Sequence, residues 1–232
     1  MQIKQFRYSM DNFSYLFHIN NKAFVIDPGA VDAIIDYVEQ NGLILETIAN
    51  THGHADHTAG NNLVVKKTGA NHIPMSRLTG EDELEFEGIK IKILHTPGHT
   101  HDSVCFIIGG YLITGDTLFN GTIGNCFSGD MKGFFNSLKM LMQQDENLVV
   151  YAGHDYVKPS LIFAKTIEPG NKAIDNFLSG YDPAHVCSTL KEELAMNPYL
   201  RFNEKSVIAF LEKKGLPVAN EWDRFQSVMK LE

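Results

Sequence analysis

The most informative stretch of this sequence is THGHADH, residues 51–57. It follows residues 46–50, an apolar segment that predicts a strand, and it runs into residues 56–68, whose spacing predicts a helix. His52 and His54 are two positions apart, so on extended backbone both rings point to the same side. Imidazoles beside a carboxylate suit first-row divalent metals, and the stretch therefore predicts a metal site rather than a histidine-rich capped turn.

Three further segments place a possible metal ligand directly after a predicted strand. They are HTPGH, TGD and AGH, which end at His99, Asp116 and His154. In each segment the ligand follows a glycine, which lets the backbone turn. Taken singly, His99 reads as a structural histidine and Asp116 as a turn cap. Four such segments in one chain favour a common metal centre.

The hydrophobic patterns divide the chain into two parts. Strands are predicted over 2–8, 14–19, 23–26, 46–50, 89–93, 104–108, 111–114 and 148–151, and helices over 31–41, 56–68 and 131–143. Beyond residue 158 no convincing strand is found, and helices are predicted over 157–168, 171–179, 189–196, 204–214 and 221–230. The sequence therefore predicts a metal-binding domain over 1–158 and an all-helical domain over 159–232.

Composition and charge exclude several classes of protein. Among 232 residues, 44% are hydrophobic and 21% charged, which is typical of a globular chain. The net charge of −8 disfavours nucleic acid as a partner. No apolar run approaches the roughly 20 residues of a membrane span, and MQIKQFRYSM is not a signal peptide. Three cysteines without a CxxC motif suggest a reducing compartment. A cytoplasmic location is expected because no targeting signal is found, and the oligomeric state is left open.

These motifs resemble the metallo-β-lactamase superfamily and, within it, glyoxalase II, the hydroxyacylglutathione hydrolases. The resemblance covers nearly the whole chain. It rests on THGHADHTAGN, HTPGHT, GDTLF, YAGHDY, FAKTIEPGN and NPYLR, in this order. It implies an α+β fold, a four-layer αββα sandwich followed by a C-terminal helical domain that binds the substrate.

The resemblance also implies two divalent metal ions per chain. One ion would be held by His52, His54 and His99. The second would be held by Asp56, His57 and His154, and Asp116 would bridge both. Zinc is the expected metal, with iron and manganese as alternatives, because imidazole and carboxylate ligands accept all three.

The implied reaction is hydrolysis of a thioester, an S-2-hydroxyacylglutathione such as S-D-lactoylglutathione, by a metal-bridging hydroxide. The substrate is thus a small-molecule thioester, and its thiolate leaves readily because a free thiol has a pKa of about 8.5. Asp56 and Asp116 are the expected catalytic residues. Asp27, in the turn VIDPG, either orients a ligand histidine or forms only the turn.

The expected substrate-binding residues are Tyr156, Asn125 and Phe127. Of these, only Tyr156 matches the family pattern, because Asn125 stands where the family has a basic residue and Phe127 where it has a tyrosine. Lys132, Lys158 and Arg224 are cations that could compensate, but the sequence does not place them. The thioester chemistry is therefore better supported than glutathione as the thiol carrier.

Other activities remain open on the same fold. A persulfide dioxygenase that uses one iron shares the first histidine motif, but it generally lacks the tail with FAKTIEPGN and NPYLR. A hydrolase of lactones, β-lactams or other thioesters, and a metal-binding protein without turnover, are further alternatives. The tail favours the hydrolase.

Overall fold

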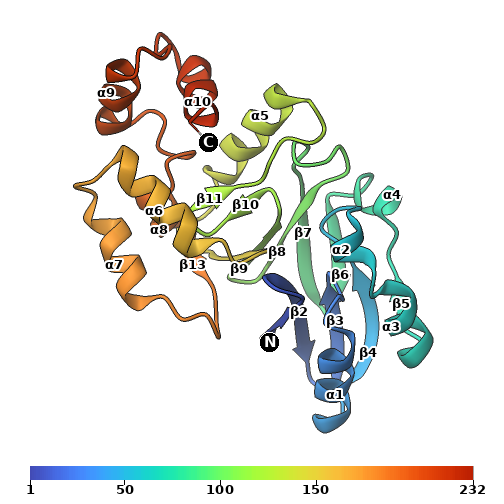
Figure 1. Ribbon diagram of the computed structural model, residues 1–232. Helices are drawn as coiled ribbons and strands as arrows, with labels where there is room; N and C mark the ends of the chain where they lie inside the picture. Colours follow the sequence, from blue (N-terminus) through green and yellow to red (C-terminus); the bar gives the residue numbers. More distant parts are fainter. Residues whose placement is uncertain (232) are drawn as a thin grey trace.

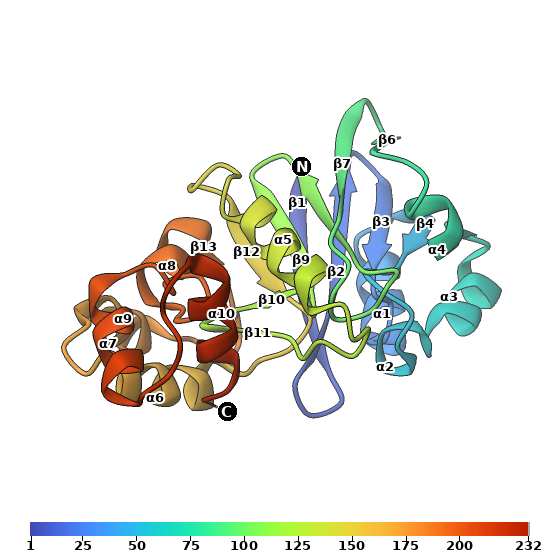
Figure 2. The same ribbon diagram turned by 90° about the horizontal axis from the view of Figure 1, so that it is seen from above.

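The computed structural model describes residues 1–231, so Glu232, the last residue of the predicted second domain, lies outside it. Two β-sheets pack face to face, and helices cover the outer side of each (Figures 1 and 2). The first sheet contains, in spatial order, β1 (Gln2–Tyr8), β2 (Asn12–Ile19), β3 (Lys22–Ile26), β4 (Ile44–Ala49) and β5 (Asn71–His72).

The second sheet has six strands. In spatial order they are β13 (Ser188–Thr189), β12 (Val149–Ala152), β9 (Tyr111–Gly115), β8 (Val104–Ile108), β7 (Ile89–His95) and β6 (Glu83–Phe86). A short antiparallel ribbon follows β9 in the chain and consists of β10 (Leu118–Phe119) and β11 (Thr122–Ile123).

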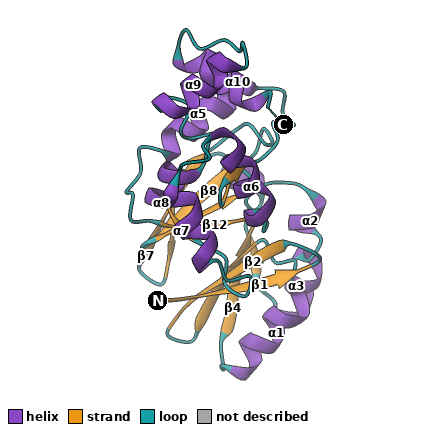
Figure 3. Ribbon diagram, turned by 60° about the vertical axis from the view of Figure 1, so that its left-hand side comes forward, coloured by secondary structure: helices purple, strands orange, loops and turns teal. Residues whose placement is uncertain are grey.

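Helices flank the sheets and form the C-terminal part. The helices up to residue 141 are α1 (Val31–Gln40), α2 (Ala55–Thr58), α3 (Asn61–Thr68), α4 (Met75–Leu78) and α5 (Met131–Leu141). The later helices are α6 (Val157–Ile167), α7 (Lys172–Gly180), α8 (Leu190–Met196), α9 (Lys205–Lys213) and α10 (Glu221–Met229). Helices α1 and α10 lie at opposite ends of the molecule (Figures 1 and 3). None of these helices combines the length and apolar character needed to traverse a bilayer.

The alternation of side chains along the strands builds the layers. In β2, Phe13, Tyr15 and Phe17 point into the core between the two sheets, where they pack with Phe106 of β8. Leu16 points the other way, into the core beneath α1 and α3. A third core lies between the second sheet, α5 and the C-terminal helices. This arrangement confirms the predicted αββα sandwich with a helical C-terminal part.

Three details differ from the sequence prediction. The helix predicted over 56–68 is two helices, α2 and α3, separated at Gly60, where a Cβ would lie 1.8 Å from the carbonyl oxygen of Pro28. The strands β5, β6, β10 and β11 and the helix α4 are absent from the sequence prediction, because segments of two to four residues carry too little periodicity. The C-terminal part is not purely helical, since β13 pairs with β12 and is too short to show alternation.

A buried carboxylate joins the C-terminal part to the β10–β11 turn. Glu193 of α8 accepts hydrogen bonds from the backbone N–H of Gly121 at 2.9 Å and from the hydroxyl of Ser188 at 2.7 Å. Asn197 donates to Glu193 at 3.0 Å and to the carbonyl of Thr122 at 2.9 Å. Burial raises the pKa of Glu193 from 4.5 to about 7, despite these hydrogen bonds.

We expect this carboxylate to lower stability as the pH rises from about 4.5 to about 7. In that interval the folded protein keeps the Glu193 proton and the unfolded chain loses it, so the native state binds more protons. Glu193→Gln should remove this contribution, which amounts to about 3 kcal/mol. Urea unfolding at pH 4.5 and pH 8 measures it, with exposed Glu85→Gln as control. An identical pH dependence in wild type and Glu193→Gln would contradict the assignment.

Candidate metal centre

Four side chains form the first group of donor atoms. His52 and His54 lie on the loop between β4 and α2, with Nε2 and Nδ1 3.0 Å apart. His99, on the loop after β7, brings Nε2 to 3.0 Å from Nδ1 of His54. Asp116, directly after β9, places Oδ2 3.4 Å from Nε2 of His99 and 3.9 Å from Nε2 of His52. These donor atoms all lie within 4.8 Å of one another.

Three side chains form the second group. His57, in α2, and His154, just after β12, have their Nε2 atoms 3.3 Å apart. Oδ2 of Asp56 is 3.6 Å from Nε2 of His57 and 3.4 Å from Nε2 of His154. The carboxylate of Asp56 is half exposed, whereas both histidines are buried. The second group is therefore open to solvent on the Asp56 side.

Asp116 lies between the two groups. Its Oδ1 is 3.3 Å from Nε2 of His57, and its Oδ2 is 3.3 Å from Nε2 of His154. The side chain is buried, and within residues 1–231 Oδ1 has no hydrogen-bond partner. A buried carboxylate oxygen in this situation calls for a cation or another donor. Asp116 therefore places a carboxylate oxygen close to donor atoms of both groups.

The donor set fits divalent metal ions. Imidazole nitrogens and carboxylate oxygens are the ligands that zinc, iron and manganese take in proteins. Ligand atoms around a tetrahedral ion with bonds of 2.0–2.1 Å lie about 3.3 Å apart. The distances between donor atoms given above, 3.0–3.9 Å in the first group and 3.3–3.6 Å in the second, are close to this value.

Two glycines allow the backbone to approach the centre, for different reasons. Gly115 has φ +49°, a conformation that glycine adopts readily, and a Cβ there would lie 2.4 Å from Oγ1 of Thr51. Gly153 has no such torsion, but a Cβ there would lie 2.1 Å from Oδ1 of Asp116. The sequence predicts that a glycine before the ligand lets the backbone turn, and this explains Gly115. Gly153 is required for a different reason, because a Cβ there would clash with Asp116.

Burial and mutual charges set the protonation states without metal. Burial lowers the pKa of His52 to about 4 and also lowers that of His99, so both are neutral and can offer a lone pair. Asp27 and Asp116 overcome the effect of burial on His57 and raise its pKa to about 11. His154 and His57, whose Nε2 atoms each lie 3.3 Å from an oxygen of Asp116, hold the pKa of that carboxyl well below its usual range, against the effect of burial. Binding of a cation to the second group therefore displaces protons.

Asp27, in the turn after β3, contacts both ends of the THGHADH stretch, residues 51–57. Its Oδ2 lies 2.9 Å from Nδ1 of His57 and accepts the Thr51 hydroxyl at 2.7 Å. Its Oδ1 accepts the backbone N–H of Thr51 at 2.8 Å. Asp27 is 1% exposed and has φ +52°, so its carboxylate and its backbone are both constrained. The sequence left two roles for Asp27, orienting a ligand histidine or only forming the turn. The contact with His57 favours the first.

The β1–β2 turn also supports the centre, which sequence reasoning missed. Oδ1 of Asp11 lies 3.0 Å from Nδ1 of His154. The amide of Asn12 donates to Oδ2 of Asp56 at 2.9 Å, and the Tyr8 hydroxyl donates to the Asp56 carbonyl at 2.8 Å. Asn12 is 4% exposed, although the sequence showed only a polar turn. No local pattern marks these residues, because their partners are far away in the chain.

Aromatic side chains flank the centre on two sides. The ring of Tyr156 stacks on His154 with centroids 5.2 Å apart, and Phe119 lies edge-on, 5.8 Å from His154. On the other side, Phe127 lies 5.2 Å from His99 and is 66% exposed. Asn125 is exposed, and its backbone oxygen lies 2.9 Å from Nδ1 of His99. The structure thus brings Tyr156, Asn125 and Phe127, the predicted substrate-binding residues, next to metal-ligand candidates.

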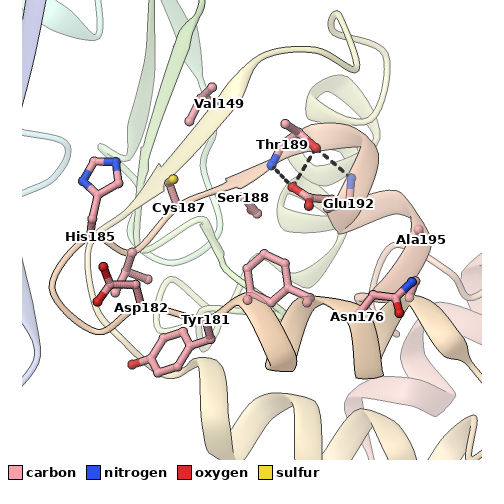
Figure 4. A pocket seen from close by; sticks show the side chains of 14 residues that line it. Val149, Asn176, Tyr181, Asp182, His185, Cys187, Ser188, Thr189, Glu192 and Ala195 are labelled. Atoms are coloured by element: carbon pink, nitrogen blue, oxygen red, sulfur yellow. Dashed lines mark hydrogen bonds between the residues drawn. The ribbon is translucent and has the colours of Figure 1, made fainter.

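Two cavities differ in their relation to the centre. A groove of about 250 Å³ includes Phe119, Asn125 and Tyr156 in its lining and so begins beside the histidines. A larger cavity of about 500 Å³ lies between α7 and β13, where Tyr181, His185 and Cys187 line it (Figure 4). Neither lining includes any of the seven candidate ligands, but Phe119 and Tyr156 of the smaller groove contact His154, and the Asn125 backbone contacts His99. These contacts place the smaller groove where it can present a substrate to the centre.

Comparison with known proteins gives a consistent result. Residues 10–81 and 71–154 match the metallo-beta-lactamase superfamily, and residues 155–231 match the hydroxyacylglutathione hydrolase C-terminus. A hydroxyacylglutathione hydrolase of Idiomarina loihiensis is 35% identical over 90% of each chain. One of Anaeromyxobacter dehalogenans is 36% identical over 88% of this chain and 87% of that protein. The crystal structure of ETHE1 from Myxococcus xanthus superimposes with a TM-score of 0.68 at 23% identity, covering 98% of this chain and 100% of that one.

Proposed function

The chain belongs to the metallo-β-lactamase superfamily and, within it, to the hydroxyacylglutathione hydrolases, and from this membership we propose that it hydrolyses S-2-hydroxyacylglutathione thioesters such as S-D-lactoylglutathione. The observation that carries the proposal is that one chain contains both the His/Asp centre and residues 155–231, which match the C-terminus of that hydrolase. Water is added, the carbon–sulfur bond breaks, and the products are a 2-hydroxy acid and a thiol. The substrate is thus a small molecule.

The two parts of the chain would have different roles. Residues 1–158 would form the metal-binding catalytic domain, and residues 159–232 the helical domain that binds the substrate. In support, the two family matches meet at residues 154 and 155, and α6 begins at Val157. The groove agrees with this division, because α6 and the β10–β11 ribbon both contribute to its lining.

The centre would hold two divalent ions. His52, His54 and His99 would bind one ion. Asp56, His57 and His154 would bind the other, and Asp116 would contact both. Zinc is the metal we propose first, with iron and manganese as alternatives. Ions of this kind supply a nucleophilic water near neutral pH and polarise a carbonyl oxygen.

The side chains of this protein would orient the reactants and move the proton. Asp27 and Asp11 each face Nδ1 of a histidine, which leaves Nε2 directed into the centre. Asn12 holds Oδ2 of Asp56, and the half-exposed Asp56 carboxylate can take a proton from the attacking water. The leaving thiolate needs no proton donor, since the pKa of a free thiol is about 8.5.

We expect Asp11→Asn to weaken metal binding by the second group about 10-fold to 100-fold, because a neutral amide orients His154 less firmly. The measurement is metal content per chain after dialysis at fixed free metal concentrations. Asp32→Asn is the matched control, since Asp32 lies exposed on α1. Equal metal content in Asp11→Asn and the control at every concentration would refute the role.

The proposed function is tested by thiol release from S-D-lactoylglutathione with metal-loaded protein at neutral pH. We expect kcat/KM of about 10⁴ M⁻¹s⁻¹ or more. Oxygen uptake with glutathione persulfide is measured in parallel. Oxygen uptake without thiol release would favour a dioxygenase and contradict the proposal. The likeness to the ETHE1 structure, at 23% identity, shows the fold alone.

A further inference from the structure

The groove beside the metal centre has a distinctive chemical character. Its lining consists of Phe119, Thr122, Ile123, Asn125, Tyr156, Pro159, Ser160 and Phe163. Phe119 and Tyr156 meet edge to face with ring centroids 5.1 Å apart, next to His154. A thioester whose carbonyl lies at the centre would therefore place its thiol carrier against aromatic and aliphatic surface.

The polar part of this lining is uncharged. It offers the amide of Asn125 and the hydroxyls of Thr122, Ser160 and Tyr156, and no Lys, Arg, Asp or Glu is among the lining residues described for residues 1–231. Groups of this kind hydrogen-bond amides, and they offer no positive charge to pair with a carboxylate.

Of the three cations that could compensate, Lys158 and Lys132 have aromatic partners, and Arg224 of α10 is not among the groove's lining residues. Nζ of Lys158 lies over the ring of Tyr181, 5.5 Å from its centroid. Nζ of Lys132 lies 4.4 Å from the ring centroid of Trp222 and 4.8 Å from that of Phe135. Cation–π contacts of this kind favour the positions in which these ammonium groups are found, away from the groove lining.

We propose that the groove recognises the uncharged amide and methylene portion of the thiol carrier, so that the enzyme accepts thioesters of uncharged, amide-bearing thiols as well as those of glutathione. This inference rests on the proposed thioester hydrolysis. Glutathione carries two carboxylates, and two charge-assisted hydrogen bonds to them would favour it by about 100-fold or more. Carboxylates that remain hydrated outside the groove give no such preference.

The test compares kcat/KM for S-D-lactoylglutathione and S-D-lactoyl-N-acetylcysteamine with the metal-loaded enzyme. N-acetylcysteamine keeps an amide and two methylenes and has no charge. We expect the two values to differ by less than about 30-fold. A stronger preference for glutathione overturns the inference and leaves thioester hydrolysis in place.

A binding measurement separates this inference from the proposed function. If neither thioester is hydrolysed, the proposed function fails, and calorimetry with S-hexylglutathione and S-hexyl-N-acetylcysteamine still decides the inference. Dissociation constants within about 30-fold of each other support it, and a larger preference for the glutathione thioether refutes it.

A variant pair tests the location of the carrier. Asn125→Lys adds a cation to the lining, and Asn125→Gln is its uncharged control. The ratio of kcat/KM for the glutathione thioester over the neutral one should be at least about 10-fold higher in Asn125→Lys than in Asn125→Gln. Equal ratios would mean that the carrier lies outside this groove, which overturns the inference.

Discussion

Asp116→Ala is expected to lower kcat/KM for the thioester by about a thousandfold or more. Asp116 contacts both donor groups, with Oδ1 3.3 Å from Nε2 of His57 and Oδ2 3.4 Å from Nε2 of His99. Alanine removes both oxygens, so each ion would lose a ligand and the two sites would lose their connection. Losses of this size are common when a group that acts on the reacting atoms is removed.

Three measurements separate a catalytic effect from unfolding. Circular dichroism and urea unfolding of metal-free Asp116→Ala should show a folded protein, since the surrounding cores contain none of the seven ligands. Metal content per chain should fall. Asp32→Ala, which removes an exposed carboxylate of α1, should retain full activity. Wild-type activity in Asp116→Ala would refute a mechanism in which two ions share this residue.

Asp27→Ala is expected to lower the free energy of unfolding of the metal-free protein by about 3–5 kcal/mol. Its carboxylate faces His57 at 2.9 Å and accepts the N–H and hydroxyl of Thr51 at 2.8 and 2.7 Å. Removing it leaves Nδ1 of the buried His57 and the buried N–H of Thr51 without their partner, and breaking a buried charged pair costs this much. The melting temperature should fall by about 10 °C.

Asp27→Asn serves as the matched variant. Asparagine tolerates the positive φ of 52° at this position, so the backbone cost is small, and what is lost is the charge and one of the two acceptor oxygens. Asp27→Asn should therefore lie between wild type and Asp27→Ala in urea unfolding. A loss below 1 kcal/mol in Asp27→Ala would show that the residue serves only to form the turn.

The fold was largely predictable because its signals are local. The alternation of Ile89, Ile91 and Ile93 with lysines and the apolar run 104–108 marked strands that proved to be β7 and β8. The capping pair Thr189 and Glu192 lies at the start of a helix that the periodicity predicts, α8. Elements of two residues, such as β13, were missed, since their pairing partners and not their own sequence make them strands.

By itself, the sequence determined the ligand types and their places at strand ends, because spacing and glycines are local properties. Only the tertiary structure decided which of them meet. The contact of Asp11 with His154 spans 143 positions, and that of His57 with His154 spans 97. It also decided that Gly153 is needed for close packing and that Lys132 and Lys158 face aromatic rings. Such contacts follow from the packing of two sheets, which no short segment encodes.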